Sequence, residues 1–129
     1  MRSISCHDAY ELVNADEPAL FIDVRTELEH YMVGHPLDCV LIPWQLEPQW
    51  EENRQFAPTV QALATSIDQP IVLICRTGQR AMQAAERLKQ LGYINVFVVS
   101  AGFDGELDEN GHRSTTNGWR FSRLPWEQM

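Results

Sequence analysis

The unbroken apolar run at residues 71–75 (IVLIC) constrains the fold of this chain more than any other segment. It contains no alternating polar residue, which is typical of a strand buried on both faces of a parallel sheet. The polar residues 76–78 end the run. From about residue 79 to residue 91 the apolar residues recur at helical spacing, and Gly92 follows as a natural stop. The segment therefore predicts a buried strand, a tight turn and a helix that covers the sheet.

The same alternation of strand-like and helix-like segments runs through the rest of the chain. Three further short apolar runs, which we interpret as strands, lie at residues 20–24 (LFIDV), 40–42 (VLI) and 96–99 (VFVV). Ser5 is placed to cap a short helix. Pro58 suits the first turn of another helix, whose buried face we expect to comprise Val60, Leu63, Ala64 and Ile67. Alternating strands and helices predict an α/β domain, residues 1–129, with a parallel sheet covered on both faces.

Charge and composition exclude several classes of partner. The formal net charge of −8 argues against nucleic acid and against anionic membranes, because both are bound through Lys and Arg. No apolar run has the length of a bilayer span, and residues 1–16 lack the apolar core of a signal peptide, so we expect a cytoplasmic protein. The three cysteines form no CxxC pair and the histidines no HExxH motif, so we expect no disulfide, no metal and no cofactor.

The turn after the strand at residues 71–75 carries the chemistry that we expect of this chain. Ligands of open α/β sheets bind at the carboxyl ends of the strands. Here Cys75 stands at such an end, directly before a helix whose first N–H groups have no intrahelical partner. Those N–H groups and the helix dipole favour an anion, and a thiol in that setting ionises readily. The alternative is an inert thiol buried in the core.

Local charge favours the reactive interpretation of Cys75. Between residues 75 and 89 four basic residues face a single acid, a local net charge of +3 in a chain of −8. Arg76 and Arg80 are near enough to contact a ligand, whereas Arg87 lies two helical turns from Arg80, about 10 Å away. Gly78 permits a positive φ in the turn. The loop therefore predicts a binding site for a small, doubly charged anion.

Several motifs in this sequence resemble the rhodanese-like sulfurtransferases. The segment CRTGQRA at residues 75–81 resembles the active-site loop of that family, and FIDVRTELE at residues 21–29 resembles its first signature. Further matches occur in the same order as in the family: VGHP at 33–36, LIPW at 41–44, AGF at 101–103, GW at 118–119 and LP at 124–125. The resemblance extends from about Ser5 to Trp126, nearly the whole chain.

The resemblance implies a three-layer rhodanese-like fold, with a parallel sheet of roughly five strands flanked by helices on both faces. It implies that Cys75 takes a sulfane sulfur from a small anionic donor such as thiosulfate and holds it as a persulfide. The acceptor would be cyanide or a cellular thiol of the thioredoxin or glutathione type. Loop residues Arg76, Thr77, Gly78, Gln79 and Arg80 would bind the substrate and stabilise the persulfide anion.

Two residues of the first signature, Asp23 and Arg25, would support the site. Asp23 ends a strand that we expect on the same sheet face as the loop, and either pairs with an arginine or caps the following turn. The sequence also departs from the family at Asp38-Cys39, where Gly-Ala is common. The departure introduces a second thiol that sequence alone does not place.

The sequence is also compatible with other functions. A dedicated persulfide carrier, or a non-catalytic sensing module on the same fold, would have a similar sequence. Phosphatases and arsenate reductases of related architecture use Cys-x5-Arg, whereas here four residues separate Cys75 from Arg80. The shorter loop forms a smaller anion-binding site, which suits a sulfur atom better than a tetrahedral phosphoryl group.

Overall fold

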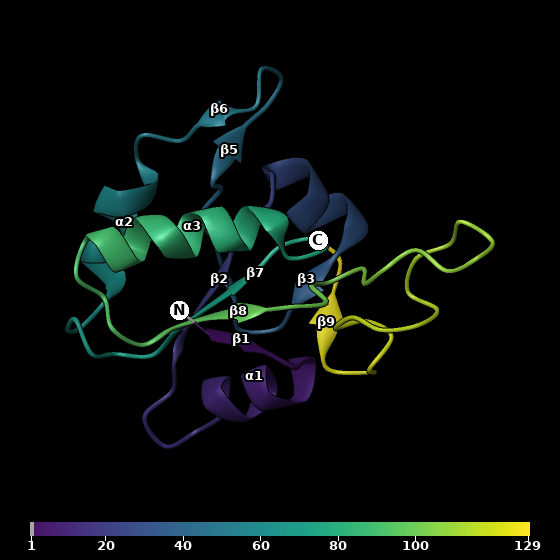
Figure 1. Cartoon of the computed structure of the whole chain (residues 1–129), viewed down its shortest axis with the longest axis horizontal. Coiled ribbons are helices and arrows are strands. Elements are labelled where there is room, and N and C mark those ends of the chain that lie inside the picture. The colour runs from purple at the N-terminus through teal and green to yellow at the C-terminus, as the bar shows by residue number, and fades with distance from the viewer. Residues whose placement is uncertain (1) are drawn as a thin grey trace.

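Five parallel strands form the central sheet, in the spatial order β1-β8-β7-β2-β4 (Figure 1). The computed structural model describes residues 2–129. The strands are β1 (Arg2–Ile4), β2 (Leu20–Asp23), β4 (Val40–Leu41), β7 (Ile71–Ile74) and β8 (Val96–Val99). The most apolar strand, β7, occupies the centre, with Ile71 in register with Leu20 on one side and Val96 on the other. The turn after β7 therefore opens at the middle of the sheet's carboxyl edge.

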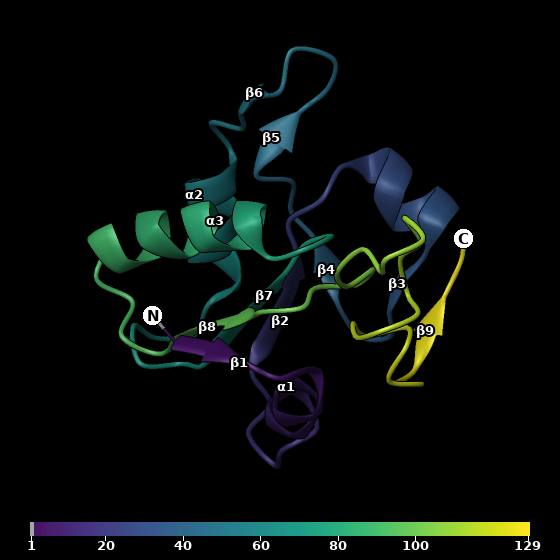
Figure 2. The ribbon, with the colours of Figure 1, turned by 45° about the vertical axis from the view of Figure 1, so that its right-hand side comes forward.

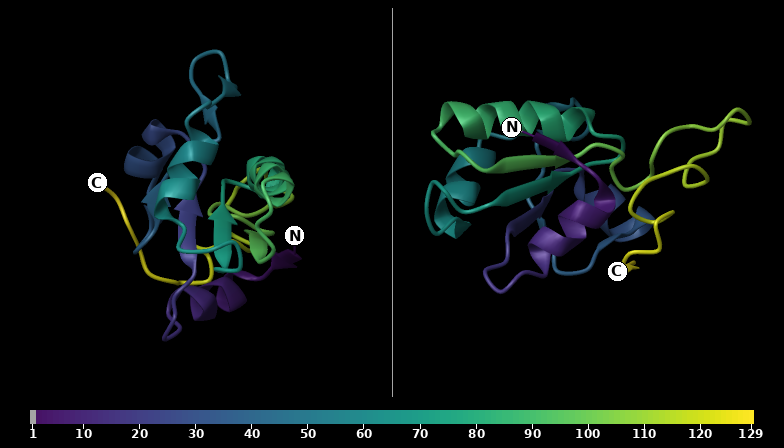
Figure 3. Two further views of the ribbon diagram at one scale, coloured as in Figure 1. Left: turned by 90° about the vertical axis from the view of Figure 1, so that its left-hand side faces the viewer. Right: turned by 60° about the horizontal axis from the view of Figure 1, so that its bottom comes forward.

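Helices cover both faces of the sheet, as the alternating pattern predicted. Helix α1 (Cys6–Val13) lies against one face, and α2 (Phe56–Leu63) and α3 (Gln79–Gln90) lie against the other (Figures 1 and 3). Side chains of β7 alternate between the two cores, so that Ile71 and Leu73 pack on the α3 side and Val72 and Ile74 on the α1 side. Each core is fully buried at its centre, which explains why β7 contains no polar residue.

The N-cap of α1 follows the prediction, whereas the buried face of α2 differs from it in part. The cap at Ser5 is confirmed, because its side-chain oxygen accepts a hydrogen bond from the Asp8 backbone N–H at 3.1 Å. The expected buried face of the second helix is partly wrong. Val60 is fully buried, but α2 ends at Leu63, and both Leu63 and Ile67 are exposed. Phe56, one turn earlier than the predicted face, takes their place in the core.

Several short elements of the structure have no strong local pattern in the sequence. One is the helical turn η1 (Glu29–Val33), with a π-type hydrogen-bonding pattern. Another is the hairpin of β5 (Gln45–Leu46) and β6 (Glu51–Glu52), which projects away from the sheet (Figure 2). A third is the antiparallel pair of β3 (His35–Pro36) with β9 (Trp126–Glu127) near the end of the chain.

The C-terminal segment is held to the body by aromatic residues. Phe103 and Trp119 are buried in the α1-side core, and the ring of Trp126 packs edge-on to Phe103 at 5.8 Å. Within residues 2–129, no helix has the length and apolar character that crossing a membrane requires.

Candidate active site

Cys75 lies at the point where the central strand turns into α3, and backbone N–H groups surround its sulfur. The side chain directly follows β7 and is 1% exposed. Its Sγ accepts hydrogen bonds from the N–H of Gly78 at 3.0 Å and of Ala81 at 3.4 Å. Both donors belong to the start of α3, where N–H groups lack intrahelical partners and the helix dipole is positive. The arrangement favours negative charge on this sulfur.

A glycine is required at position 78 for this geometry. Gly78 has φ of +107°, a conformation that L side chains seldom adopt. A Cβ atom there would also lie 2.8 Å from the carbonyl oxygen of Ser100. The predicted positive φ is confirmed, and it turns the Gly78 N–H toward the sulfur. Thr77 is half-buried in the same loop, and Gln79 is exposed at the first position of α3.

The segment that follows β8 supports the Cys75 loop through backbone contacts. The N–H of Phe103 donates to the carbonyl of Cys75 at 2.8 Å, and the N–H of Asp104 donates to that of Arg76 at 3.1 Å. Gly102 lies so close that a Cβ atom on it would collide with both carbonyl oxygens. The loop is therefore braced by three consecutive residues from a distant part of the chain, an arrangement that preorganises the N–H donors.

The two arginines of the loop have different surroundings. The Arg76 side chain is 51% exposed, and its Nε donates to Oδ2 of Asp104 at 3.0 Å. Arg80 is largely buried, and its two terminal nitrogens donate to the two carboxylate oxygens of Glu29 at 2.7 and 2.8 Å. Arg76 thus remains accessible from solvent, whereas Arg80 is held in one orientation by a bidentate ion pair.

Glu29, which the sequence analysis did not assign to the site, positions Arg80. Burial alone would raise the pKa of Glu29, but the hydrogen bond and charge of Arg80 outweigh it and hold that pKa below its ordinary value. The Glu29 pair raises the pKa of Arg80, and a smaller contribution comes from the nearby Cys75 sulfur. The available signal was the position of Glu29 at the end of the first signature.

An aromatic side chain lies over the Arg80 guanidinium. Trp50 stands in the turn of the β5–β6 hairpin with φ of +58°, and its ring centroid lies 5.7 Å from Cζ of Arg80. A bulky residue seldom adopts a positive φ, so the backbone of this turn has an uncommon conformation at Trp50. The hairpin therefore contacts the site through Trp50, although the hairpin was not predicted.

The model of the family described as "Rhodanese-like domain" matches residues 5–109 of the chain. The chain belongs to the rhodanese-like domain family. It is 31% identical over 132 residues to an uncharacterized protein of Rickettsia conorii, with 98% of each chain covered. It is also 28% identical to the thiosulfate sulfurtransferase GlpE of Haemophilus influenzae over 104 residues. This match covers 81% of this chain and 86% of the relative.

A solved structure supports the same fold. The crystal structure of Rv0390 from M. tuberculosis superimposes with a TM-score of 0.85 at 31% identity, covering 100% of this chain and 98% of that one. The three-layer fold and its five-stranded parallel sheet, which the motif resemblance implied, are thereby confirmed for this rhodanese-like domain.

Asp23 and Arg25 form a buried ion pair, and Asp23 both pairs with an arginine and caps the turn. Its Oδ1 accepts from the backbone N–H of Arg25 at 3.0 Å and from Nε at 2.9 Å, and its Oδ2 accepts from Nη2 at 2.9 Å. Both side chains are fully buried. Oδ2 also lies 2.8 Å from Nδ1 of His30, a partner that sequence reasoning missed.

The expectation that Asp23 shares a sheet face with the loop is wrong. Asp23 is in register with Ile74, whose side chain packs in the α1-side core, whereas Cys75 packs in the α3-side core. Strand side chains alternate between faces, so a carboxylate at this register points away from Cys75. The pair adjoins the loop's supporting segment, because the Arg25 guanidinium lies over the ring of Phe103 at 4.6 Å. The charge of Asp23 also makes a small contribution to the raised pKa of Arg80.

The second thiol, Cys39, also lies on the α1 side of the sheet. Its Sγ donates to the carbonyl of Pro36 at 3.1 Å, and its pKa is raised by burial and by the negative charge of Asp23. Cys6 is buried at the start of α1, and burial raises its pKa to about 11. All three thiols are free, and neither Cys6 nor Cys39 packs in the core that contains Cys75.

One cluster of side chains that could ligate a metal surrounds Asp23. Ligand atoms of Asp23, His30 and Cys39 lie within 4.8 Å of one another. However, the Arg25 guanidinium already binds both carboxylate oxygens of Asp23. A metal ion at this position would have to displace one buried cation or lie beside it, so the donor set does not suit a metal.

Proposed function

We propose that this rhodanese-like domain is a sulfurtransferase that carries sulfane sulfur as a persulfide on Cys75. The observation that carries the proposal is the pair of hydrogen bonds, 3.0 and 3.4 Å long, from the N–H groups of Gly78 and Ala81 to Sγ. Donors fixed in this way stabilise a thiolate before the reaction and a persulfide anion after it. The similarity to the thiosulfate sulfurtransferase GlpE supports the same assignment.

The first half-reaction loads the sulfur. The Cys75 thiolate attacks the outer sulfur of thiosulfate, a new S–S bond forms, and the S–S bond of thiosulfate breaks. Sulfite leaves with the electron pair of the broken bond. The dianionic donor approaches through the side where Arg76 is half-exposed, because that guanidinium is the accessible positive charge of the loop.

The second half-reaction unloads the sulfur. A thiophilic acceptor such as cyanide attacks the outer sulfur of the Cys75 persulfide, the S–S bond breaks, and the Cys75 thiolate leaves with its electron pair. Cyanide becomes thiocyanate, while a thiol acceptor would become a persulfide. The thiolate returns to its N–H donors ready for another cycle, so no general base is needed on the protein.

Phosphatase chemistry is disfavoured by the position of Arg80. Both terminal nitrogens of its guanidinium are bound to Glu29, so they are not free to clamp a phosphoryl group. Arsenate reduction meets the same objection. This leaves sulfur transfer, to cyanide, to a small thiol or to one dedicated partner, as the chemistry that the loop serves best.

Incubation with thiosulfate should add one sulfur atom to the protein. We expect intact-mass spectrometry to show this addition, and peptide mapping to place it on the peptide that contains Cys75. The matched control is the double variant Cys6→Ser/Cys39→Ser. Both of its replaced thiols lie outside the α3-side core, so it should gain the same mass as the parent. Sulfur found only on Cys39 would refute the assignment.

The two loop arginines should affect different kinetic constants. Arg76→Ala removes the accessible charge and should mainly raise KM for thiosulfate, whereas Arg80→Ala disrupts the ordered pair with Glu29 and should mainly lower kcat. Loss of one charge-assisted contact corresponds to about 10- to 100-fold in either constant. Arg87→Ala, two helical turns away, is the control and should behave like the parent. Identical kinetics in all three variants would leave the backbone donors as the sole source of reactivity.

A further inference from the structure

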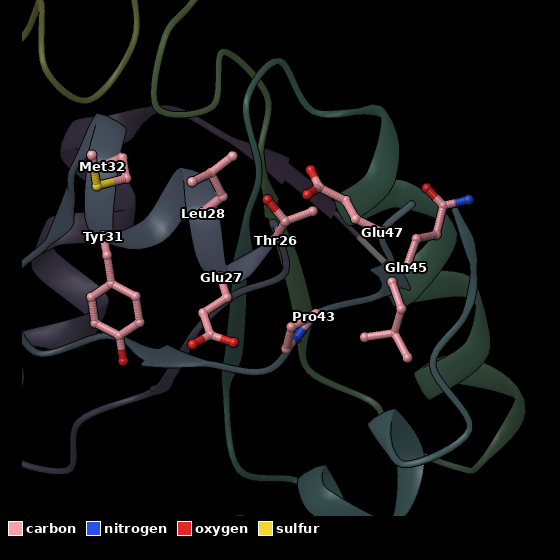
Figure 4. Close-up of a pocket in the computed structure, with 9 residues that line it drawn as sticks. Thr26, Glu27, Leu28, Tyr31, Met32, Pro43, Gln45 and Glu47 are labelled. Carbon is pink, nitrogen blue, oxygen red and sulfur yellow. The ribbon is translucent and has the colours of Figure 1, made fainter. Parts of the chain in front are cut away.

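An open apolar groove lies beside the active site, between η1 and the β5–β6 hairpin. Its volume is about 480 Å³. Apolar side chains dominate its walls: Leu28, Tyr31 and Met32 on the η1 side, and Pro43 on the hairpin side (Figure 4). Leu46, in strand β5 of the hairpin, also lines the groove. Thiosulfate and cyanide are small polar ions that make no use of such a surface. The reaction with these small substrates therefore leaves the groove unexplained.

The groove is too open to enclose a small molecule. Leu28 is 60% exposed and Met32 is 62% exposed, although both line it. A site for a small ligand buries most of that ligand's surface. Exposed large apolar residues gathered in one patch, with Tyr and Met among them, are typical of surfaces that bind another polypeptide.

The groove adjoins the catalytic loop through two contacts. Thr26, which lines the groove, donates its hydroxyl to Oε1 of Glu29 at 3.1 Å, and Glu29 holds Arg80. The hairpin that supplies Leu46 also supplies Trp50, whose ring lies over Arg80. A polypeptide that lies in the groove would therefore pass beside the residues that surround Cys75.

The charge of the groove indicates the chemistry of its partner. Glu27 and Glu47 line it and are exposed, and neither forms an ion pair within residues 2–129. The lining contains no basic side chain to balance them. In Figure 4, Glu27 lies on the η1 side and Glu47 on the hairpin side. An apolar floor with an acidic rim complements a segment that carries apolar residues beside Lys or Arg.

We infer that this groove docks the sulfur acceptor, a protein whose reactive cysteine is flanked by apolar and basic residues. The inference rests on the proposed function, because the docked thiol is the group that takes sulfur from Cys75. The acceptor thiolate attacks the outer sulfur of the persulfide, the Cys75 thiolate leaves, and the acceptor cysteine becomes the persulfide. The groove thus selects a polypeptide acceptor over a small thiol.

Binding without chemistry tests the docking surface directly. The first probe, the lysine peptide, is a short fluorescent peptide in which leucines and lysines flank a serine that replaces the reactive cysteine. The second probe carries glutamates in place of the lysines. In fluorescence anisotropy at fixed salt, the lysine peptide should bind about tenfold more tightly. Charge reversal in Glu27→Lys/Glu47→Lys should invert this preference. Equal affinity for the two peptides would overturn the proposal.

Matched substitutions locate the binding surface. Met32→Glu and Leu46→Glu, one from each wall, should each weaken binding of the lysine peptide about tenfold. Ile94→Glu is the control, because Ile94 is 67% exposed and precedes β8, at the opposite edge of the sheet from Cys75. Equal losses in all three variants would overturn the proposal. So would a dimer in sedimentation experiments that Met32→Glu dissociates, because the groove would then bind a second copy.

Turnover separates failure of the docking surface from failure of the proposed function. With thiosulfate as donor, the cysteine form of the lysine peptide should accept sulfur faster than glutathione, and Met32→Glu should remove this advantage while the rate with cyanide stays unchanged. Normal turnover with cyanide but no peptide binding would refute the docking surface alone. Selective peptide binding without any turnover would refute the sulfurtransferase proposal and leave the docking surface in place.

Discussion

Replacing Cys75 with serine should reduce thiosulfate-to-cyanide sulfur transfer by at least about 10³-fold, the scale of loss when a covalent nucleophile is removed. A serine hydroxyl cannot hold sulfur as a persulfide, so the loss should appear in kcat and not as a change in KM alone. The measurement is steady-state formation of thiocyanate at saturating thiosulfate.

The fold should survive this substitution, which keeps the result interpretable. Cys75 is packed in the α3-side core, and oxygen replaces sulfur with only a small change of volume. Circular dichroism and the denaturant midpoint should therefore stay close to those of the parent. Cys39→Ser, on the other face of the sheet, is the matched control and should retain activity. Turnover above a few per cent in Cys75→Ser would place the transferred sulfur elsewhere.

Breaking the buried Asp23–Arg25 ion pair should strongly lower the free energy of unfolding. Arg25→Ala leaves the Asp23 carboxylate fully buried without its main counter-ion, and removal of one partner of such a pair typically costs about 3–5 kcal/mol in the free energy of unfolding. Denaturant titration measures the change. Arg54 is an exposed arginine in the turn before α2, and Arg54→Ala should change the free energy of unfolding by only about 0.5 kcal/mol.

A double-mutant cycle and a pH series test the cause of this loss. Asp23→Ala/Arg25→Ala should be less destabilised than the sum of the two single variants, because neither charge is then left buried alone. Burial by itself would raise the pKa of Asp23, but His30 and Arg25 hold it below its ordinary value. The stability that the ionised Asp23 carboxylate contributes to the fold is therefore fully present above about pH 3.9. It is lost as pH falls toward the lower pKa that Asp23 has in the folded state. Additive effects, or an unchanged acid dependence in Asp23→Asn, would contradict this account.

The strands and helices with strong local patterns follow from the sequence alone. The apolar runs of β2, β7 and β8 admit few other interpretations, since each is rich in β-branched or aromatic residues and too short for a helix. The helical spacing of the alanines and leucines of α3 predicts a helix that starts at Gln79, where the structure has it. The Cys75–Arg80 loop is also local, because six consecutive residues carry its thiol, its glycine and its two arginines.

Contacts between distant residues were decided by the tertiary structure. Arg80 and Glu29 are 51 positions apart, and no local pattern shows that the two meet. β1 (Arg2–Ile4) has little strand character of its own, and it forms because it pairs along β8 more than 90 residues later. The face on which Asp23 lies depended on register with β7, which turned the carboxylate away from Cys75. Hydrophobic periodicity records only whether a residue is buried, whereas its partner is set by how the packed elements meet.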